Sequence, residues 1–163
     1  MLSQTLFKFN TETNINHWVV TDDVVMGGES SGSFSLSPEG YGEFKGNVSL
    51  ENNGGFSSVR YKFQTKNVTD YNHVVLRVKG DGKNYQFRVK ANSSDYYSYI
   101  APFKTSGEWQ EVTILLQDMY PAFRGKTLDK PNFDKNHIEE LTFLIANKKQ
   151  ENFKLLIDFI ELR

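Results

Sequence analysis

Apolar and polar residues alternate with a period of two along most of this chain, and this pattern constrains its fold more than any other feature. It is clearest in residues 44–50, 57–63, 74–78, 85–89, 97–103 and 109–116. A period of two places alternate side chains on opposite faces of a β-strand, whereas an amphipathic helix needs a period near 3.6. The chain is therefore predicted to be built from half-buried strands.

The remaining segments extend this all-β prediction. Residues 141–146 and 153–162 are almost continuously apolar, which is typical of central strands covered on both faces. The Asp81-Gly82 pair predicts a hairpin between residues 74–78 and 85–89. One helical turn is expected after Asp134, and residues 117–137 are expected to be a long irregular segment. We predict one domain over residues 1–163, a β-sandwich or barrel with roughly nine or ten strands and little helix.

Composition excludes several classes of function. The formal net charge is −1, from 19 basic and 20 acidic residues, without the basic excess expected of a nucleic-acid binder. The absence of cysteine excludes disulfides and thiolate chemistry. No apolar run is long enough for a membrane helix, and the first ten residues do not resemble a signal peptide. We therefore expect a cytoplasmic protein without membrane insertion.

Catalytic and metal-binding motifs give little signal. His17, His73 and His137 are far apart in sequence, and neither a G-x-S-x-G elbow nor a phosphate-binding loop occurs. We assign no catalytic residue and no cofactor. A structural calcium ion is a weak alternative, with carboxylate ligands from Asp22, Asp23 and Asp158.

Two regions could form a binding site. The first is the loop that contains Asp22, Asp23 and a Met-Gly-Gly sequence, which we expect to pack near the Asn52–Gly55 turn through Asp–Arg or Asp–amide bonds. Arg60 is the expected partner of these acids or of a ligand. The second is a polar sheet face carrying Arg60, Arg77, Arg88 and Lys90 together with Ser58, Gln86 and Tyr96. Such a face is either a solvated outer surface or a concave site that captures carboxylate or phosphate groups.

Two N-terminal blocks, "DDVVMGGESSGSF" and "GEFKGNVSLENNGGFSSVR", resemble the signature of the complex I intermediate-associated protein family. The "GDGKNYQFRV", Trp109, "FRG" and "LLIDFIEL" segments extend this resemblance over about residues 18–162. The resemblance implies a jelly-roll β-sandwich of the galactose-binding-like type. It also implies a chaperone-like role in assembling respiratory complex I. The early start of the domain resembles a compact, bacterial-type relative.

Three functions are compared on this basis. The first is a non-enzymatic binding protein that holds a protein client, which could be respiratory-complex subunits. The second is a carbohydrate- or small-ligand-binding module with sugar-stacking rings at Tyr96, Trp109 and Tyr120. The third is an enzyme using Asp22 or Asp23 with Arg60 or Arg88. The candidate ligand- or partner-binding residues are Asp22, Asp23, Met26, Gly27, Gly28, Ser30, Asn53, Arg60, Arg88, Tyr96, Trp109 and Arg124.

Overall fold

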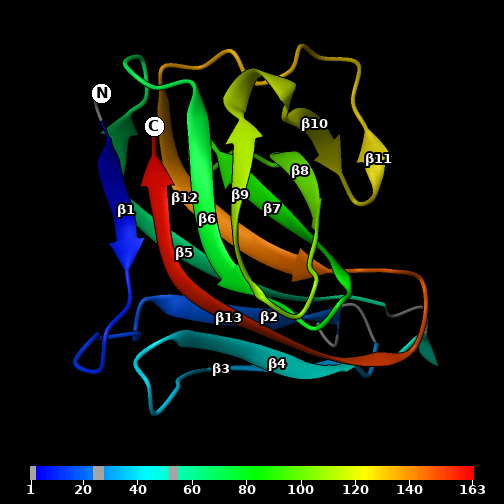
Figure 1. Cartoon of the computed structure of the whole chain (residues 1–163). Helices are drawn as coiled ribbons and strands as arrows, with labels where there is room; N and C mark the ends of the chain where they lie inside the picture. Colours follow the sequence, from blue (N-terminus) through cyan, green and yellow to red (C-terminus); the bar gives the residue numbers. More distant parts are fainter. Residues whose placement is uncertain (1–2, 24–27, 52–54) are drawn as a thin grey trace.

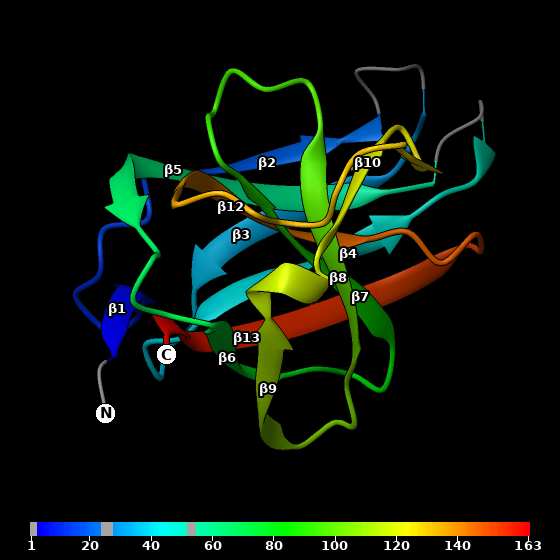
Figure 2. The same ribbon diagram turned by 90° about the horizontal axis from the view of Figure 1, so that it is seen from above.

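The described part of the chain folds into two antiparallel sheets packed face to face (Figures 1 and 2). A computed structural model describes residues 3–23, 28–51 and 55–163. The six-stranded sheet has the order β3 (Ser31–Leu36), β4 (Gly42–Val48), β13 (Glu151–Leu162), β6 (His73–Lys79) and β9 (Trp109–Leu115), with β1 (Gln4–Lys8) also paired to β13. The seven-stranded sheet has the order β11 (Lys126–Thr127), β10 (Tyr120–Phe123), β8 (Ser98–Lys104), β7 (Asn84–Lys90), β12 (His137–Ile145), β5 (Ser57–Asn67) and β2 (Trp18–Asp22).

The core lies between the two inner sheet faces and is rich in aromatic rings. Trp18 stacks between Phe34 and Tyr61, with ring centroids 5.0 Å apart in each pair. Phe87 and Phe143 meet edge to face in the centre of the seven-stranded sheet, and both side chains are fully buried. These large flat side chains bury much apolar surface per residue. This explains how a chain with only 38% hydrophobic residues fills a two-sheet core.

The predicted fold class is confirmed, since the described residues form an all-β two-sheet sandwich. The described residues contain thirteen strands rather than nine or ten, and their one regular helical segment is the 3-10 turn η3 (Leu116–Asp118). The segment 117–137 was expected to be irregular, but it contains the short strands β10 and β11. The helical turn predicted after Asp134 is wrong, because residues 137–145 pair as β12 between β5 and β7.

The predicted hairpin around Asp81-Gly82 is also wrong. Its two arms are β6 and β7, and these strands belong to different sheets. The turn at residues 80–83 is therefore a connection between the sheets. The segment between β4 and β5 also joins the two sheets, because β4 belongs to one sheet and β5 to the other. A sandwich needs connections between its two sheets, and the Gly-rich composition of these two segments is also typical of hairpin turns.

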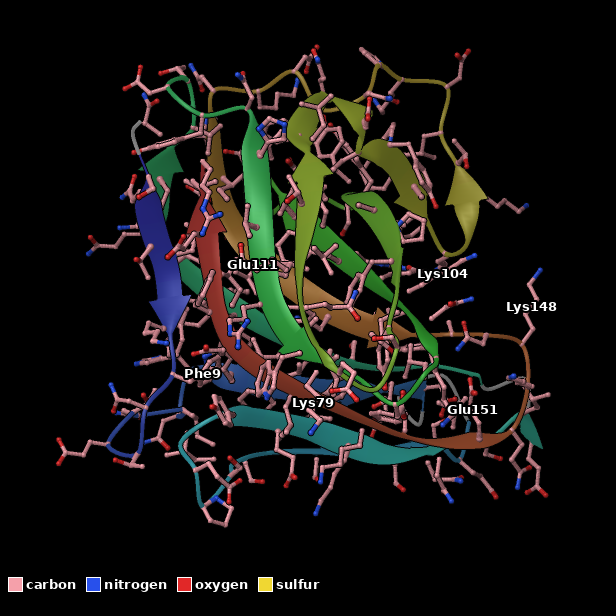
Figure 3. All side chains as sticks on the ribbon, viewed as in Figure 1. Phe9, Lys79, Lys104, Glu111, Lys148 and Glu151 are labelled. Carbon is pink, nitrogen blue, oxygen red and sulfur yellow. The ribbon has the colours of Figure 1, made fainter. Side chains whose placement is uncertain are left out.

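Figure 3 shows another crossing, the turn from β12 to β13, with Lys148 in the turn and Glu151 at the start of β13. Lys148 has a positive φ of 59°, which permits the sharp change of direction. After the turn, β13 becomes the central strand of the six-stranded sheet. It pairs with β4 and β1 along one side and with β6 along the other.

Candidate functional site

The carboxylate of Asp23 organises the corner where β2 ends. The side chain is 1% exposed. Its Oδ1 accepts a hydrogen bond from the Ser30 amide at 2.9 Å, and its Oδ2 accepts bonds from the Ser30 hydroxyl at 2.5 Å, the Gly55 amide and the Phe56 amide at 3.2 Å. Burial alone would raise the pKa of Asp23, but these hydrogen bonds outweigh burial and lower the pKa below its usual value.

Asp22 extends the same corner to the edge strand of the other sheet. Its Oδ2 accepts a hydrogen bond from the Gly32 amide in β3 at 2.9 Å, and its Oδ1 accepts one from the Ser57 hydroxyl in β5. Gly32 lies opposite Gly46 in the β3–β4 pair. A Cβ on Gly32 would lie 2.1 Å from the Ser57 hydroxyl oxygen, so a larger residue here would displace the Ser57 hydroxyl from its bond to Asp22.

Asp22 and Asp23 are therefore held by backbone amides and hydroxyl groups, in agreement with the Asp–amide alternative and not with the Asp–Arg one. Ser30 contributes a second link, because its hydroxyl oxygen accepts a hydrogen bond from the Ser49 amide at 2.9 Å. The Gly28 amide donates to the Asp23 carbonyl at 2.9 Å. Among the described residues, these hydrogen bonds join β2 to β5, to the start of β3 and to the segment after β4, so they link the two sheets. Met26, Gly27 and Asn53 lie outside the described residues.

Arg60 does not take part in this corner, contrary to the Asp–Arg pairing considered from sequence. It pairs with Val19 of β2 on one side and with Thr142 of β12 on the other, on the face of β5 that points away from the core. Among the described residues it forms no ion pair. The Asp22 and Asp23 corner and Arg60 are separate features.

The outer face of the seven-stranded sheet brings Arg60 and Arg88 together. Both residues pair with Thr142, Arg60 from β5 and Arg88 from β7. The three side chains form one row across the sheet, which we call the arginine row. The row continues through Ile100 of β8 to Tyr120 of β10. Adjacent strands lie about 4.8 Å apart, so the Cα atoms of the two arginines are separated by about 10 Å.

A second row lies beside the first, displaced by two residues along each strand. Glu140 of β12 pairs with Lys62 of β5 and with Lys90 of β7, and we call these three residues the lysine row. We call Arg60, Lys62, Arg88 and Lys90 the basic cluster. Successive residues on one strand face lie about 7 Å apart, so the cluster covers a patch of about 10 by 7 Å. Glu140, which is 4% exposed, lies in register between Lys62 and Lys90.

None of the four cations in the basic cluster forms an ion pair with another described residue. Lys90 donates a hydrogen bond to the Asp95 carbonyl at 2.8 Å. Arg88 donates two to the Gln86 amide oxygen, from Nε at 3.0 Å and from Nη2 at 2.7 Å. Burial lowers the pKa of the Arg88 guanidinium, and the nearby Tyr120 acts in the opposite direction. Arg88 is thus a partly desolvated cation with a neutral partner.

The outer face of the six-stranded sheet is arranged differently. Lys45 and Lys154 pair with Glu43, at 3.5 and 3.3 Å, and Arg77 pairs with Asp158 at 3.1 Å. Arg77 was expected to share a face with Arg60 and Arg88, but it belongs to β6 and hence to the other sheet. On this outer face these charges are paired with each other, whereas on the other face none of the four cations of the basic cluster forms an ion pair with a described residue.

The predicted aromatic candidates do not form one platform. Trp109 lies on β9, where it contacts the Tyr41 ring at 4.5 Å and the Arg77 guanidinium at 5.1 Å. Tyr96 precedes β8, is 57% exposed and contacts Phe123 at 5.3 Å. Arg124 lies over that same Phe123 ring and has a positive φ of 50°. Tyr96 and Arg124 are thus near each other, and Trp109 belongs to the opposite sheet.

The described residues do not form the weak calcium site considered from sequence. Asp158 forms ion pairs with Lys8 and Arg77. The carboxylates of Asp22 and Asp23 accept the hydrogen bonds described above. No group of three or more His, Cys, Asp or Glu side chains is placed to hold a metal ion in residues 3–23, 28–51 and 55–163. Over the same residues, no helix has the length and apolar character required to cross a bilayer.

Sequence reasoning placed Arg60, Arg88 and Lys90 on one polar face and predicted residues 141–146 as a central strand, but it did not predict that this strand lies between β5 and β7. Glu140 was missed because residues 134–141 were interpreted as a helical turn. Thr142 was missed because the sequence does not show which strands the 141–146 strand pairs with. Lys62 was recognisable, since it alternates with Arg60 opposite the apolar residues of β5. Tyr120 was considered only as a sugar-stacking ring, whereas the structure places it at the end of the arginine row.

Comparison with known proteins establishes the family. The profile of the Complex I intermediate-associated protein 30 (CIA30) family matches residues 7–157. The chain belongs to this family. It is 26% identical to the mitochondrial Complex I intermediate-associated protein 30 of Drosophila melanogaster, over 96% of this chain and 62% of the fly protein. The Mus musculus protein of the same name is 24% identical, with 97% of this chain and 55% of the mouse protein covered.

The chain thus spans between about half and three-fifths of the length of these relatives. Among solved structures, the family 11 carbohydrate-binding module of a Clostridium thermocellum cellulase has a TM-score of 0.74 at 15% identity, covering 98% of this chain and 93% of the module. The same module bound to a mixed-linkage tetrasaccharide has a TM-score of 0.70 at 14% identity and covers 95% and 94% of the two chains. At these identities, the likeness establishes the sandwich fold.

Proposed function

We propose that this protein is a non-enzymatic, chaperone-like binding protein that takes part in assembling respiratory complex I. Family membership supports the link to complex I, because the relatives carry the name of complex I intermediate-associated proteins. The basic cluster is the observation that supports binding. Four cations share an outer sheet face without an ion pair among the described residues.

A rigid sheet is well suited to hold a partner. Backbone hydrogen bonds on both sides fix β12 and β7 in place, so their side chains present a fixed pattern of charge. A preorganised surface loses less conformational entropy on binding than a mobile loop does. The Asp23 corner serves this role indirectly, since it holds the edge of the same sheet against the other layer.

Affinity capture tests the proposal. The tagged protein is expressed at its natural level in its own host, and captured proteins are quantified by mass spectrometry. Enrichment of complex I subunits over a tag-only control is the expected result. The matched variants are Arg88→Gln in the basic cluster and Lys45→Gln on the opposite sheet. Capture of no respiratory-complex subunit by the wild-type protein would reject the assembly role, and mixed-linkage glucans and other sugars would then be tested as ligands.

A further inference from the structure

We propose that the basic cluster recognises an extended, acidic segment of a protein client, with Arg88 as the anchoring residue. This inference rests on the proposed function and specifies the chemistry of the partner at the same site. Its basis is charge complementarity between the outer face of the seven-stranded sheet and carboxylate groups spaced along an extended chain.

The imbalance of charge is localised in the arginine row. In the lysine row, Glu140 lies in register between Lys62 and Lys90 and supplies a nearby negative charge. In the arginine row, the corresponding central residue is Thr142, which is neutral. Arg60 and Arg88 therefore form the uncompensated part of the cluster. The protein as a whole has a net charge of −1, so this cationic patch is a local feature and not a consequence of a basic composition.

Arg88 is held in a geometry that leaves hydrogen-bond donors available. A guanidinium carries five N–H donors in a rigid plane. Gln86 accepts from Nε and Nη2, which fixes the orientation of that plane. The other donors have no protein acceptor within the described ranges. A carboxylate is the ligand that accepts two parallel N–H bonds from a guanidinium, and such charge-assisted bonds are stronger than neutral ones.

The spacing of the cluster matches an extended peptide. Side chains two residues apart on one face of an extended chain are about 7 Å apart. This is also the spacing between Arg60 and Lys62 on β5 and between Arg88 and Lys90 on β7, since each pair is separated by two residues. A segment with acidic residues at alternate positions can therefore place successive carboxylates along one strand of the sheet.

The site is partly desolvated, which increases the strength of charge pairing. Arg60, Arg88 and Lys90 are half-buried, and Ile100 and Leu144 lie in the neighbouring outward positions of β8 and β12. Charges in such surroundings interact more strongly than fully exposed charges do. The side chain of Tyr120, at the end of the arginine row, supplies a hydroxyl group and an aromatic ring close to Arg88.

Binding of defined peptides to the purified protein tests the inference. The probe is a fluorescein-labelled peptide of alternating glutamate and alanine, and the matched peptide has glutamine in place of glutamate. We expect the acidic peptide alone to bind, measured by fluorescence anisotropy, and its affinity to fall as salt is raised. Amide chemical shifts should change in β5, β7 and β12 and not in β4 or β6.

Variants assign the effect to residues. Arg88→Gln should weaken peptide binding by about tenfold, because one charge-assisted pair is lost. Arg60→Gln should weaken it by a smaller factor, and Lys45→Gln on the opposite sheet should leave it unchanged. If Arg88→Gln does not fold, Arg60→Gln and the chemical-shift map of the wild-type protein carry the test.

Several outcomes would overturn the inference. These are equal binding of the glutamine peptide, chemical shifts confined to the six-stranded sheet, or unchanged affinity in Arg88→Gln and Arg60→Gln. Binding of a neutral mixed-linkage glucan to this face, without the acidic peptide, would also overturn it. Loss of the inference and loss of the proposed function are distinguishable. Capture of complex I subunits that persists in Arg88→Gln supports the assembly role and rejects this site.

Discussion

Removing the Asp23 carboxylate should destabilise the fold more than any comparable change at an acidic residue on the surface. In Asp23→Ala, the amides of Ser30, Gly55 and Phe56 and the Ser30 hydroxyl lose their acceptor. A hydrogen bond to a charged group contributes about 1.5–3 kcal/mol, and partial hydration of the released amides reduces the sum. We therefore expect the free energy of unfolding to fall by about 3–5 kcal/mol.

Urea denaturation followed by tryptophan fluorescence measures this change, since Trp18 lies in the core at the start of β2, the strand that ends beside Asp23. Asp129→Ala is the matched control, because Asp129 is an exposed acid whose side chain forms no hydrogen bond or ion pair with another described residue, and it should change stability by about 0.5 kcal/mol or less. A loss below about 1 kcal/mol in Asp23→Ala would refute the reasoning. It would mean that the four bonds contribute no more than an ordinary exposed polar group.

The same carboxylate predicts a dependence of stability on pH. The pKa of Asp23 is lower in the folded state than its usual value, so the unfolded chain binds the proton more tightly. The stabilisation is complete above the ordinary carboxyl pKa of about 3.9 and is lost as the pH falls through the lower, folded pKa. Asp23→Asn removes the titrating group and should flatten this part of the stability curve, while the Asp129→Ala control should retain it.

Three further changes probe the packing and the two outer faces. Gly46→Ala should destabilise the protein by about 2 kcal/mol or more, because the added Cβ would lie 2.0 Å from the Ser31 carbonyl oxygen; thermal unfolding measures this. Arg88→Met should leave stability unchanged or raise it by about 1 kcal/mol, since a partly desolvated cation without an ion pair is replaced by an apolar side chain. A loss of stability above about 2 kcal/mol would contradict that account. Asp158→Asn should cost about 1 kcal/mol at low salt and less at high salt, because its partners Lys8 and Arg77 are accessible to water; a salt-independent loss would argue against it.

The fold class could be predicted because the local alternation in the sequence agrees with the two-sheet architecture of the structure. Strand periodicity depends on which face of each strand is buried, and the alternating residues of β5 and β7 predicted that face correctly. The pairing of strands is less accessible. The Asp81-Gly82 turn has the composition of a hairpin turn, but it joins strands of different sheets. A turn sequence defines the local bend and contains no information about which sheet the next strand joins.

The candidate site was predicted in part for the same reason. The outward positions of Arg60 and Arg88 follow from alternation within each strand. Their proximity depends on β12, a strand more than fifty residues further along the chain, which inserts between β5 and β7. Its first residues, 137–140, are mostly polar or charged and follow Asp134, a residue that suits a helix start, so local reasoning gave the wrong element at this end of the strand. Long-range pairing decided the outcome.

The contrast between the two outer faces bears on how a shared sandwich can serve different partners. The layers, the aromatic core and the Asp23 corner stabilise the fold irrespective of what the outer face of the seven-stranded sheet carries. The two arginine side chains make few contacts that the fold requires. Among the described residues, Arg60 forms no ion pair, and the side-chain hydrogen bonds of Arg88 go to its neighbour Gln86. Substitution of these arginines can therefore change the partner at small cost to stability. The unchanged or increased stability expected for Arg88→Met is an example. A gain in stability together with a loss of acidic-peptide binding in that variant would show that the cation is retained for recognition and not for folding.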